Sequence, residues 1–150
     1  MTPDNREKEA QEEMRRLREC LQATHFLHRL KYPELEKLMS AIKKIHYPAG
    51  SLVFQQGDPG DNFYMVSRGT LSYWVKKLLG EKKVTDLHPM DYFGEAALLS
   101  SAPRSATVKA ETDCDLFVIR KDDFKATLMA NPEIAQFIKE HMAQRAQAKK

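Results

Sequence analysis

A glycine followed by an acid, with an arginine shortly after, forms the part of this chain best suited to binding chemistry. Gly94 permits a tight turn directly before a predicted short helix that starts at Glu95 and ends near Leu99. The first amides of a helix have no partners within it, so this terminus favours an anion through its free N–H groups and its dipole. Arg104 follows Pro103 and is predicted to begin a strand. Its planar guanidinium can pair with two oxygens of one phosphate, which a lysine cannot do.

The acid adds a second requirement to the ligand. An ionised Glu95 only accepts hydrogen bonds, so beside an anion it needs a hydroxyl donor, such as a ribose 2′-OH. A small ligand with one phosphate charge and a free ribose hydroxyl meets both requirements, and a 3′,5′-cyclic nucleotide is such a ligand. Taken singly, each residue is ordinary, and Arg104 could instead form a plain salt bridge with Glu95. The prediction therefore depends on the conjunction of the residues.

Two longer motifs contain these residues. The first is Phe93-Gly94-Glu95-x-Ala97-Leu98, followed after five residues by Arg104-Ser105-Ala106-x-Val108-x-Ala110. The second lies upstream and is Gly57-Asp58-x-Gly60-x-x-Phe63-Tyr64-Met65-Val66-x-x-Gly69. The first motif resembles the phosphate-binding cassette of the cyclic-nucleotide-binding domain family, and the second resembles the first signature of that family. The resemblance covers about residues 24–146. That family includes regulatory subunits of protein kinase A, cGMP-dependent kinases, nucleotide-gated channels and the bacterial catabolite activator protein.

The resemblance implies a mainly β fold, an eight-stranded antiparallel β jelly-roll barrel with N-terminal helices and C-terminal lid helices. It implies that the cyclic phosphate is bound by Arg104, Ser105, Ala106 and Ala97, and the ribose by Glu95 and Gly94. The residues it implies for the base and the lid are Phe93, Ser105, Phe137, Ile138, Met142 and Arg145. For the lid stripe, plain packing against the barrel stays an open alternative. We expect cAMP rather than cGMP as the ligand, although a hydroxyl at Ser105 could contact guanine.

The elements that must position these residues begin with two helices. Residues 6–22 carry an apolar stripe at Met14, Leu17 and Leu21, with Glu12 and Arg16 as an i,i+4 pair. A second helix is predicted from Pro33, a favoured first helical position. Its apolar positions repeat at helical spacing and are Leu35, Leu38, Met39, Ile42 and Ile45.

A long β region and more helices follow. Short apolar runs separated by turn residues indicate a sandwich or barrel rather than a parallel sheet. The predicted strands are 51–54, 63–66, 71–78, 82–87, 105–110 and 114–120, with Gly80-Glu81 as the hairpin turn. A short helix is predicted from Lys121 or Asp122, with Phe124 and Leu128 on one face, and Asn131-Pro132 starts another. We therefore divide the chain into a charged helix (1–23), a nucleotide-binding domain (24–146, with its jelly roll at 46–120 and its C-terminal helices at 121–146) and a flexible tail (147–150).

Composition restricts the class of protein. With 42% hydrophobic and 30% charged residues, the chain of 150 residues is typical of one soluble domain. The sequence contains no run of 18 apolar residues, so no membrane-spanning helix is predicted within it. The densely charged start is unlike a secretory signal. A net charge of +3 is too small to predict a nucleic-acid-binding surface. Cys20 and Cys114 have no metal or redox spacing, so we expect a reduced, cytoplasmic protein.

Three other classes of function compete with nucleotide sensing. The five histidines form no catalytic or metal-binding pattern, so we expect neither an enzyme nor a metal site. After the predicted lid helix too few residues remain for a DNA-reading helix-turn-helix. The alternative kept is a domain of the same fold that oligomerises or docks on an effector protein (a channel, a kinase or another) through residues 6–45, independently of nucleotide.

Overall fold

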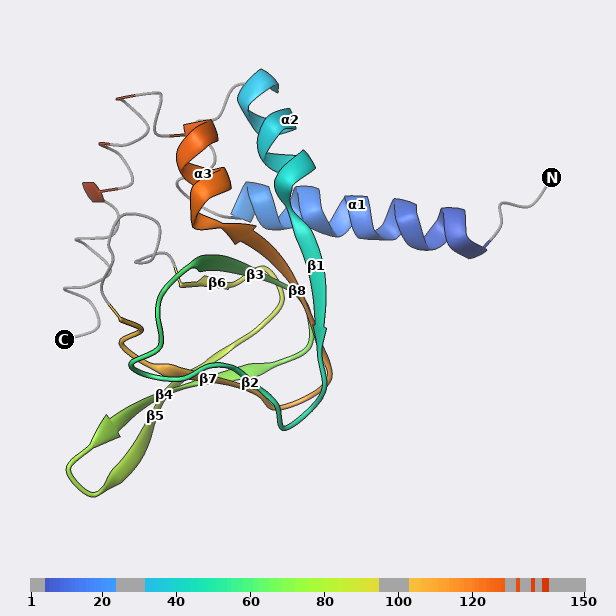
Figure 1. The fold of residues 1–150 in the computed structure, drawn as a ribbon. Helices are drawn as coiled ribbons and strands as arrows, with labels where there is room; N and C mark the ends of the chain where they lie inside the picture. The colour runs from blue at the N-terminus through green and yellow to red at the C-terminus, as the bar shows by residue number, and fades with distance from the viewer. Residues whose placement is uncertain are drawn as a thin grey trace.

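Two four-stranded antiparallel sheets form the body of the protein, which is a β jelly roll (Figure 1). The computed structural model describes residues 5–23, 32–94 and 103–128, and the single positions 132, 136, 139 and 140. One sheet has the strand order β1-β8-β3-β6 and the other β2-β7-β4-β5. The strands are β1 (Lys43–Tyr47), β2 (Leu52–Phe54), β3 (Asn62–Arg68), β4 (Leu71–Lys77), β5 (Gly80–Leu87), β6 (Tyr92–Phe93), β7 (Thr107–Ala110) and β8 (Cys114–Arg120). The expected fold class is confirmed.

The three helices of the described residues lie on one side of the barrel, and the β4–β5 hairpin extends beyond it on the opposite side (Figure 1). They are α1 (Asn5–Ala23), α2 (Tyr32–Ala41) and α3 (Lys121–Leu128). The helices predicted at residues 6–22, from Pro33 and from Lys121 are thus confirmed. The helix predicted from Asn131 lies outside the described residues, apart from four single positions.

The prediction that the helical face of α2 continues to Ile45 is wrong. The helix ends at Ala41, and Ile45 lies in β1, where its side chain is 39% exposed. Antiparallel pairing with β8 over Lys43–Tyr47 gives this segment a full ladder of backbone hydrogen bonds, which outweighs a helical spacing of apolar residues. The jelly roll therefore begins three residues before position 46.

Most strand bounds differ from the prediction by one or two residues, and two of these differences affect the hairpin and the site. Lys77 pairs with Gly80, so the hairpin turn consists of Leu78 and Leu79 rather than Gly80-Glu81. The strand predicted from residue 105 begins at Thr107, which leaves Arg104 in the connection before β7 rather than in a strand. β1 and the two-residue β6 were not predicted, because both depend on pairing with distant strands.

Alternate residues of β3 face two separate apolar cores. The helix-side cluster packs the helices on the outer face of the first sheet, and its buried residues are Leu17, Cys20, Leu21, Leu38, Phe63, Met65, Phe117, Ile119 and Phe124. The barrel cluster fills the space between the sheets, and its buried residues are Tyr64, Val66, Leu71, Leu87, Phe93, Val108, Ala110, Cys114, Leu116 and Val118. This division follows from the period-2 alternation of a strand that is covered on both faces.

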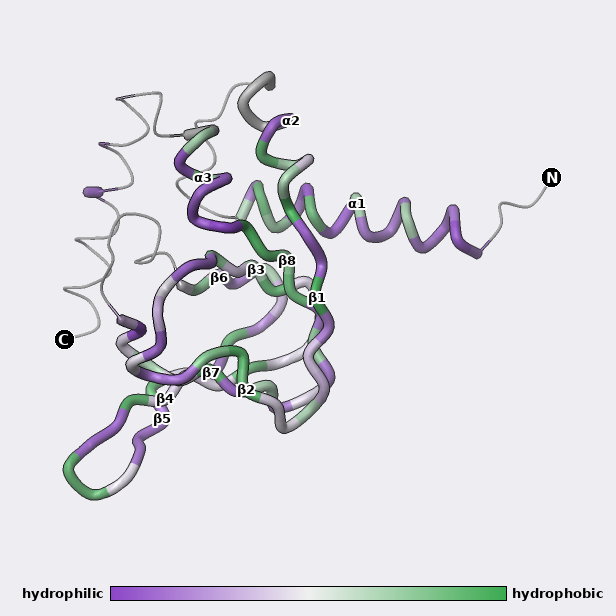
Figure 2. The backbone as a smooth tube through the Cα atoms, viewed as in Figure 1, coloured by the Kyte–Doolittle hydropathy of each residue, from purple (hydrophilic) through white to green (hydrophobic). Residues whose placement is uncertain are grey.

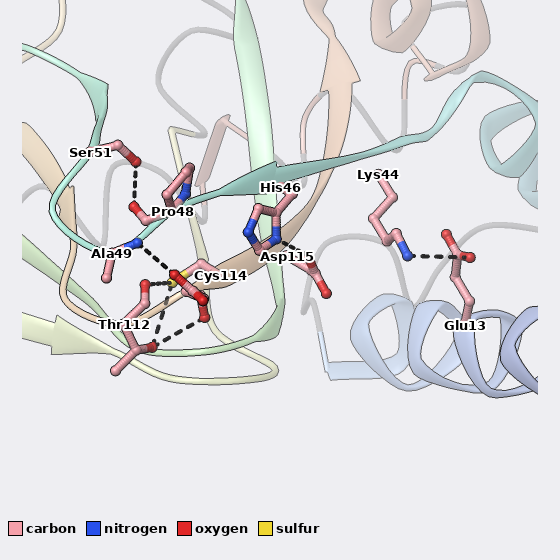
Figure 3. Close-up of polar contacts among 10 residues, drawn as sticks. Glu13, Lys44, His46, Pro48, Ala49, Ser51, Thr112, Cys114 and Asp115 are labelled. Atoms are coloured by element: carbon pink, nitrogen blue, oxygen red, sulfur yellow. Dashed lines mark hydrogen bonds and ion pairs between the residues drawn. The ribbon is translucent and has the colours of Figure 1, made fainter.

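Polar contacts hold the exposed edge strand β1 to its neighbours (Figure 3). Lys44 Nζ lies 3.6 Å from a carboxylate oxygen of Glu13 on α1, and His46 Nδ1 lies 2.8 Å from an oxygen of Asp115 on β8. Beyond β1, the Ala49 amide donates to the Asp113 carboxylate at 2.8 Å. These side chains are exposed or half-buried, so they fix the edge of the barrel while contributing little stability.

Candidate functional site

The two sequence motifs meet in the backbone around Arg104. The Arg104 amide donates to the Asp58 carbonyl at 2.7 Å, and the Gly57 amide donates to the Arg104 carbonyl at 2.8 Å. The turn at Gly57 and Asp58 is closed on itself, because the Gln55 amide donates to the Asp58 carboxylate. The upstream motif therefore supplies the backbone partners that fix the position of the Arg104 backbone.

The Arg104 side chain runs into the protein rather than into solvent. Arg104 is only 8% exposed. Nη2 donates to the Asn62 carbonyl at 2.7 Å, and Nη1 donates to the Gly94 carbonyl at 3.3 Å. The guanidinium carbon lies 4.1 Å from the centre of the Phe54 ring, close enough for a cation–π contact. β2, β3 and the residue after β6 thus surround one buried cation.

Among the described residues this cation forms no ion pair, although the nearby charge of Asp61 attracts it. The two backbone carbonyls are neutral acceptors, and the buried Nε has no hydrogen-bond partner in the described part of the chain. Burial lowers the pKa of Arg104, which reflects the cost of desolvating its charge. A buried charge without a counterion is unfavourable, so an anion beside this guanidinium would be strongly stabilised.

Gly94 is required at its position for two reasons. Its φ of +82° is in the region that side chains rarely adopt. A Cβ here would also lie 2.9 Å from Arg104 Nη1 and 3.1 Å from the Asn62 carbonyl oxygen. The glycine therefore lets the backbone pass directly against the guanidinium, and its own carbonyl becomes one of the two acceptors.

Phe93 belongs to the barrel core beside this site. Its side chain is 2% exposed and stacks on Tyr64, with ring centres 4.9 Å apart and planes 10° apart. Phe54 packs against both rings, at 5.9 Å from Phe93 and 5.8 Å from Tyr64. Phe93 thus supports the wall on which Arg104 lies, and its contact with a base stays a prediction.

The remaining predicted residues divide into described and undescribed ones. Ser105 is exposed, with its hydroxyl 3.5 Å from that of Tyr73 on β4, while Ala106 is 1% exposed. The structure therefore brings Phe93, Gly94 and Arg104 together, with Ser105 and Ala106 following directly. The predicted residues that lie outside the described part are Glu95, Ala97, Phe137, Ile138, Met142 and Arg145.

Sequence reasoning missed the three residues that hold the guanidinium. Phe54 ends β2, and Asn62 and Tyr64 lie at the start of β3, within the upstream motif. The centre of the Tyr64 ring lies 5.7 Å from the guanidinium carbon. Their proximity to Arg104 arises only when strands from both sheets close the barrel. The one available signal was that the upstream motif occurs together with the cassette. Among the described residues, no group of three or more His, Cys, Asp or Glu side chains could hold a metal ion.

Comparison with known proteins assigns the fold and the motifs to one family. The family model described as "Cyclic nucleotide-binding domain" matches residues 44–131. The chain is 36% identical over 108 residues to a cAMP-dependent protein kinase regulatory subunit from Emericella nidulans, an alignment that covers 72% of this chain and 26% of that protein. The chain thus spans about a quarter of the length of this relative.

Solved structures agree with this assignment. The Thermus thermophilus catabolite activator protein superposes with a TM-score of 0.72 at 30% identity, covering 82% of this chain and 58% of that one. A cAMP-bound PfPKA-R structure superposes with a TM-score of 0.73 at 27% identity, covering 85% of this chain and 43% of that one.

Proposed function

This chain belongs to the cyclic nucleotide-binding domain family, and on that premise we propose that it is a sensor that binds cAMP in preference to cGMP. The observation that carries this proposal is the buried Arg104 guanidinium, which has two neutral acceptors and forms no ion pair among the described residues. A cyclic phosphate carries the single negative charge that this cation needs, and two of its oxygens match the guanidinium fork.

The other contacts follow from the two motifs. Arg104 binds the phosphate, together with the backbone and hydroxyl of Ser105 and the backbones of Ala106 and Ala97. Glu95 accepts a hydrogen bond from the ribose 2′-OH beside Gly94. The base rests near Phe93 and is covered by the C-terminal helix. The lid residues are Phe137, Ile138, Met142 and Arg145.

A preference for cAMP has support from the relatives. The similar curated protein is named a cAMP-dependent protein kinase regulatory subunit, and a similar solved structure contains cAMP.

Transmission of binding runs through β3. Tyr64 belongs to the barrel cluster beside Arg104, and the flanking Phe63 and Met65 belong to the helix-side cluster. A small shift of β3 on ligand binding therefore repacks the contacts of α1, α2 and α3. The ligand shifts this equilibrium only by the ratio of its affinities for the two arrangements. The helices present the result to an effector protein, which in the relatives' case is a kinase by name.

The location we propose is the cytoplasm. Cys20 and Cys114 are both buried and neither is in a disulfide, which suits a reducing compartment. The domain itself binds and transmits, without catalysis. In the described residues, no helix has both the length and the apolar character needed to cross a bilayer.

Calorimetric titration of the folded, nucleotide-free chain with cAMP and then cGMP tests the proposal. We expect one-to-one binding, tighter for cAMP. Arg104→Ala should weaken binding by about 2–5 kcal/mol, because it leaves the phosphate unpaired. Arg120→Ala is the matched control, since the Arg120 side chain is 67% exposed and pairs with Asp123, and its removal should leave binding unchanged.

Two results would count against the proposal. An Arg104→Ala affinity within tenfold of the unchanged chain would remove Arg104 as the phosphate contact. No heat with either nucleotide would leave the domain as an oligomerising or docking module. Sedimentation would then show self-association through residues 6–45 that nucleotide does not alter.

A further inference from the structure

The β4–β5 hairpin extends beyond the barrel and ends in two leucines. Lys77 pairs with Gly80, so Leu78 and Leu79 alone form the turn. The register shifts between Tyr73 and Trp74, which pair with Thr85 and Lys83, so that Val84 is an extra residue in β5. Such a bulge bends and twists the strand pair. Figure 1 shows the hairpin pointing away from α1, α2 and α3.

The turn residues are unsuited to a turn and are exposed. Leu78 and Leu79 are 102% and 96% exposed, whereas the other exposed large hydrophobic residues of the described chain reach only 47%. Two-residue hairpin turns favour Asn, Asp or Gly. Figure 2 shows this apolar tip between hydrophilic strand segments. These two leucines are unfavourable in a tight turn, and they make no packing contact with the barrel that would offset this. Such exposed apolar residues are typical of a binding site.

Lysines surround the tip on both strands. Lys76 and Lys77 precede the leucines and Lys82 and Lys83 follow them, and all four are exposed. The acids nearby are already engaged, because Glu81 pairs with Lys109 and Asp86 pairs with Lys83, each at 3.0 Å. Within the described chain, Lys76, Lys77 and Lys82 form no ion pair, so their charge is available to a partner.

We infer that this hairpin tip docks the protein on an anionic lipid bilayer. Leu78 and Leu79 enter the boundary between headgroups and acyl chains, and the lysines contact the anionic headgroups. A two-residue apolar tip is long enough for this boundary, which lies about 5–10 Å deep. Juxtamembrane lysines are attracted to anionic lipid over about one Debye length.

The distribution of charge favours a flat surface over a protein groove. Successive residues of a strand point to opposite faces, so Lys76 and Lys77 lie on opposite faces of the hairpin. A groove on a protein would contact one face and leave the other lysine unused. A bilayer approached end-on places lysines of both faces at the same depth. In this orientation α1, α2 and α3 point away from the membrane (Figure 1).

Vesicle co-sedimentation of the full chain without nucleotide tests this inference. We expect binding to vesicles of phosphatidylcholine mixed with phosphatidylserine, weakened by added salt, and little binding to phosphatidylcholine alone. Lys76→Gln with Lys77→Gln should weaken binding by about fivefold for each lysine. Leu78→Ser with Leu79→Ser should weaken it by at least about tenfold. Because both leucines are fully exposed, this variant should keep its thermal midpoint.

Matched controls separate docking from net charge. Lys8→Gln with Lys125→Gln removes the same charge from exposed lysines of α1 and α3, and should leave vesicle binding nearly unchanged. Equal loss in this control, equal binding to both vesicle types, or unchanged binding of the leucine variant would each overturn the inference. Self-association that the leucine variant abolishes, without vesicle binding, would overturn it in favour of a second copy of the chain. Since no nucleotide is present, none of these outcomes bears on the cyclic-nucleotide proposal.

Discussion

The two faces of β3 differ in what their neighbours satisfy. On the helix side, Phe63 and Met65 are 0% exposed and pack against apolar residues from three helices and from β8. On the barrel side, Tyr64 packs on Phe93, and the same ring lies 5.7 Å from the charged Arg104 guanidinium. One face is complete without a ligand, and the other ends at a buried charge that forms no ion pair among the described residues. If Arg104 binds the phosphate as we propose, stability and binding depend on opposite faces of one strand.

The two faces of β3 should differ most in the free energy of unfolding. Phe63→Ala should lower it by about 3–5 kcal/mol, because a fully buried ring leaves a cavity in the helix-side cluster. Arg104→Met should leave it within about 1 kcal/mol, because the lost hydrogen bonds are offset by removal of a desolvated charge. Urea unfolding of both variants without nucleotide measures the two values. Equal destabilisation by the two substitutions would show that both faces of β3 contribute equally to stability.

The helix-side cluster should also respond to alkaline pH through Cys20. Burial, followed by the nearby Glu19 charge, raises the pKa of this thiol to about 11. The folded state therefore keeps a proton that the unfolded state loses between its ordinary pKa of 9.0 and 11. The stabilisation is complete below pH 9.0 and is lost as the pH rises to about 11. The change over this window is about 2–3 kcal/mol.

Cys20→Ala separates this thiol from the other groups that titrate at alkaline pH. Unfolding free energies of both chains should be measured from neutral pH to above the raised pKa. We expect a shallower decline in the variant. Parallel curves for the two chains would show that Cys20 does not titrate in this window and that its surroundings are more polar than the packing implies.

The sequence predicted the parts of this molecule that depend on neighbours in the chain. The ends of β8 and the start of α3 were predicted to the residue or nearly so, and the two motifs identified Arg104. What was missed depends on distant pairing. β1 follows a helical spacing of apolar residues and becomes a strand only because β8 offers it a partner. The acceptors of the guanidinium, Asn62 and Gly94, meet only across the barrel.

A smaller effect should distinguish Gly94, which lies at the site, from Gly50, which lies elsewhere in the barrel. Both have a positive φ, of +82° and +88°, but only Gly94 has neighbours that a Cβ would meet. Gly50→Ala should cost about 1–2 kcal/mol of stability from backbone strain alone. Gly94→Ala should cost more and should also weaken nucleotide binding, because its Cβ would displace Arg104 Nη1. Thermal unfolding and calorimetry give both quantities, and equal costs with unchanged affinity would exclude the steric contact.

The smallest effect concerns the surface of the helix side, where Lys44 of β1 lies 3.6 Å from Glu13 of α1. Both side chains are about 40% exposed, so water screens the pair and each side chain loses rotamer freedom to form it. A double-mutant cycle with Lys44→Ala and Glu13→Ala should give a coupling below about 0.5 kcal/mol that falls further with added salt. A coupling of several times that value would mean that α1 is held by charge, and the helix side would no longer be the face completed by apolar packing alone. A small coupling, beside the large cost of Phe63→Ala, locates the attachment of α1 in its buried Leu17, Cys20 and Leu21.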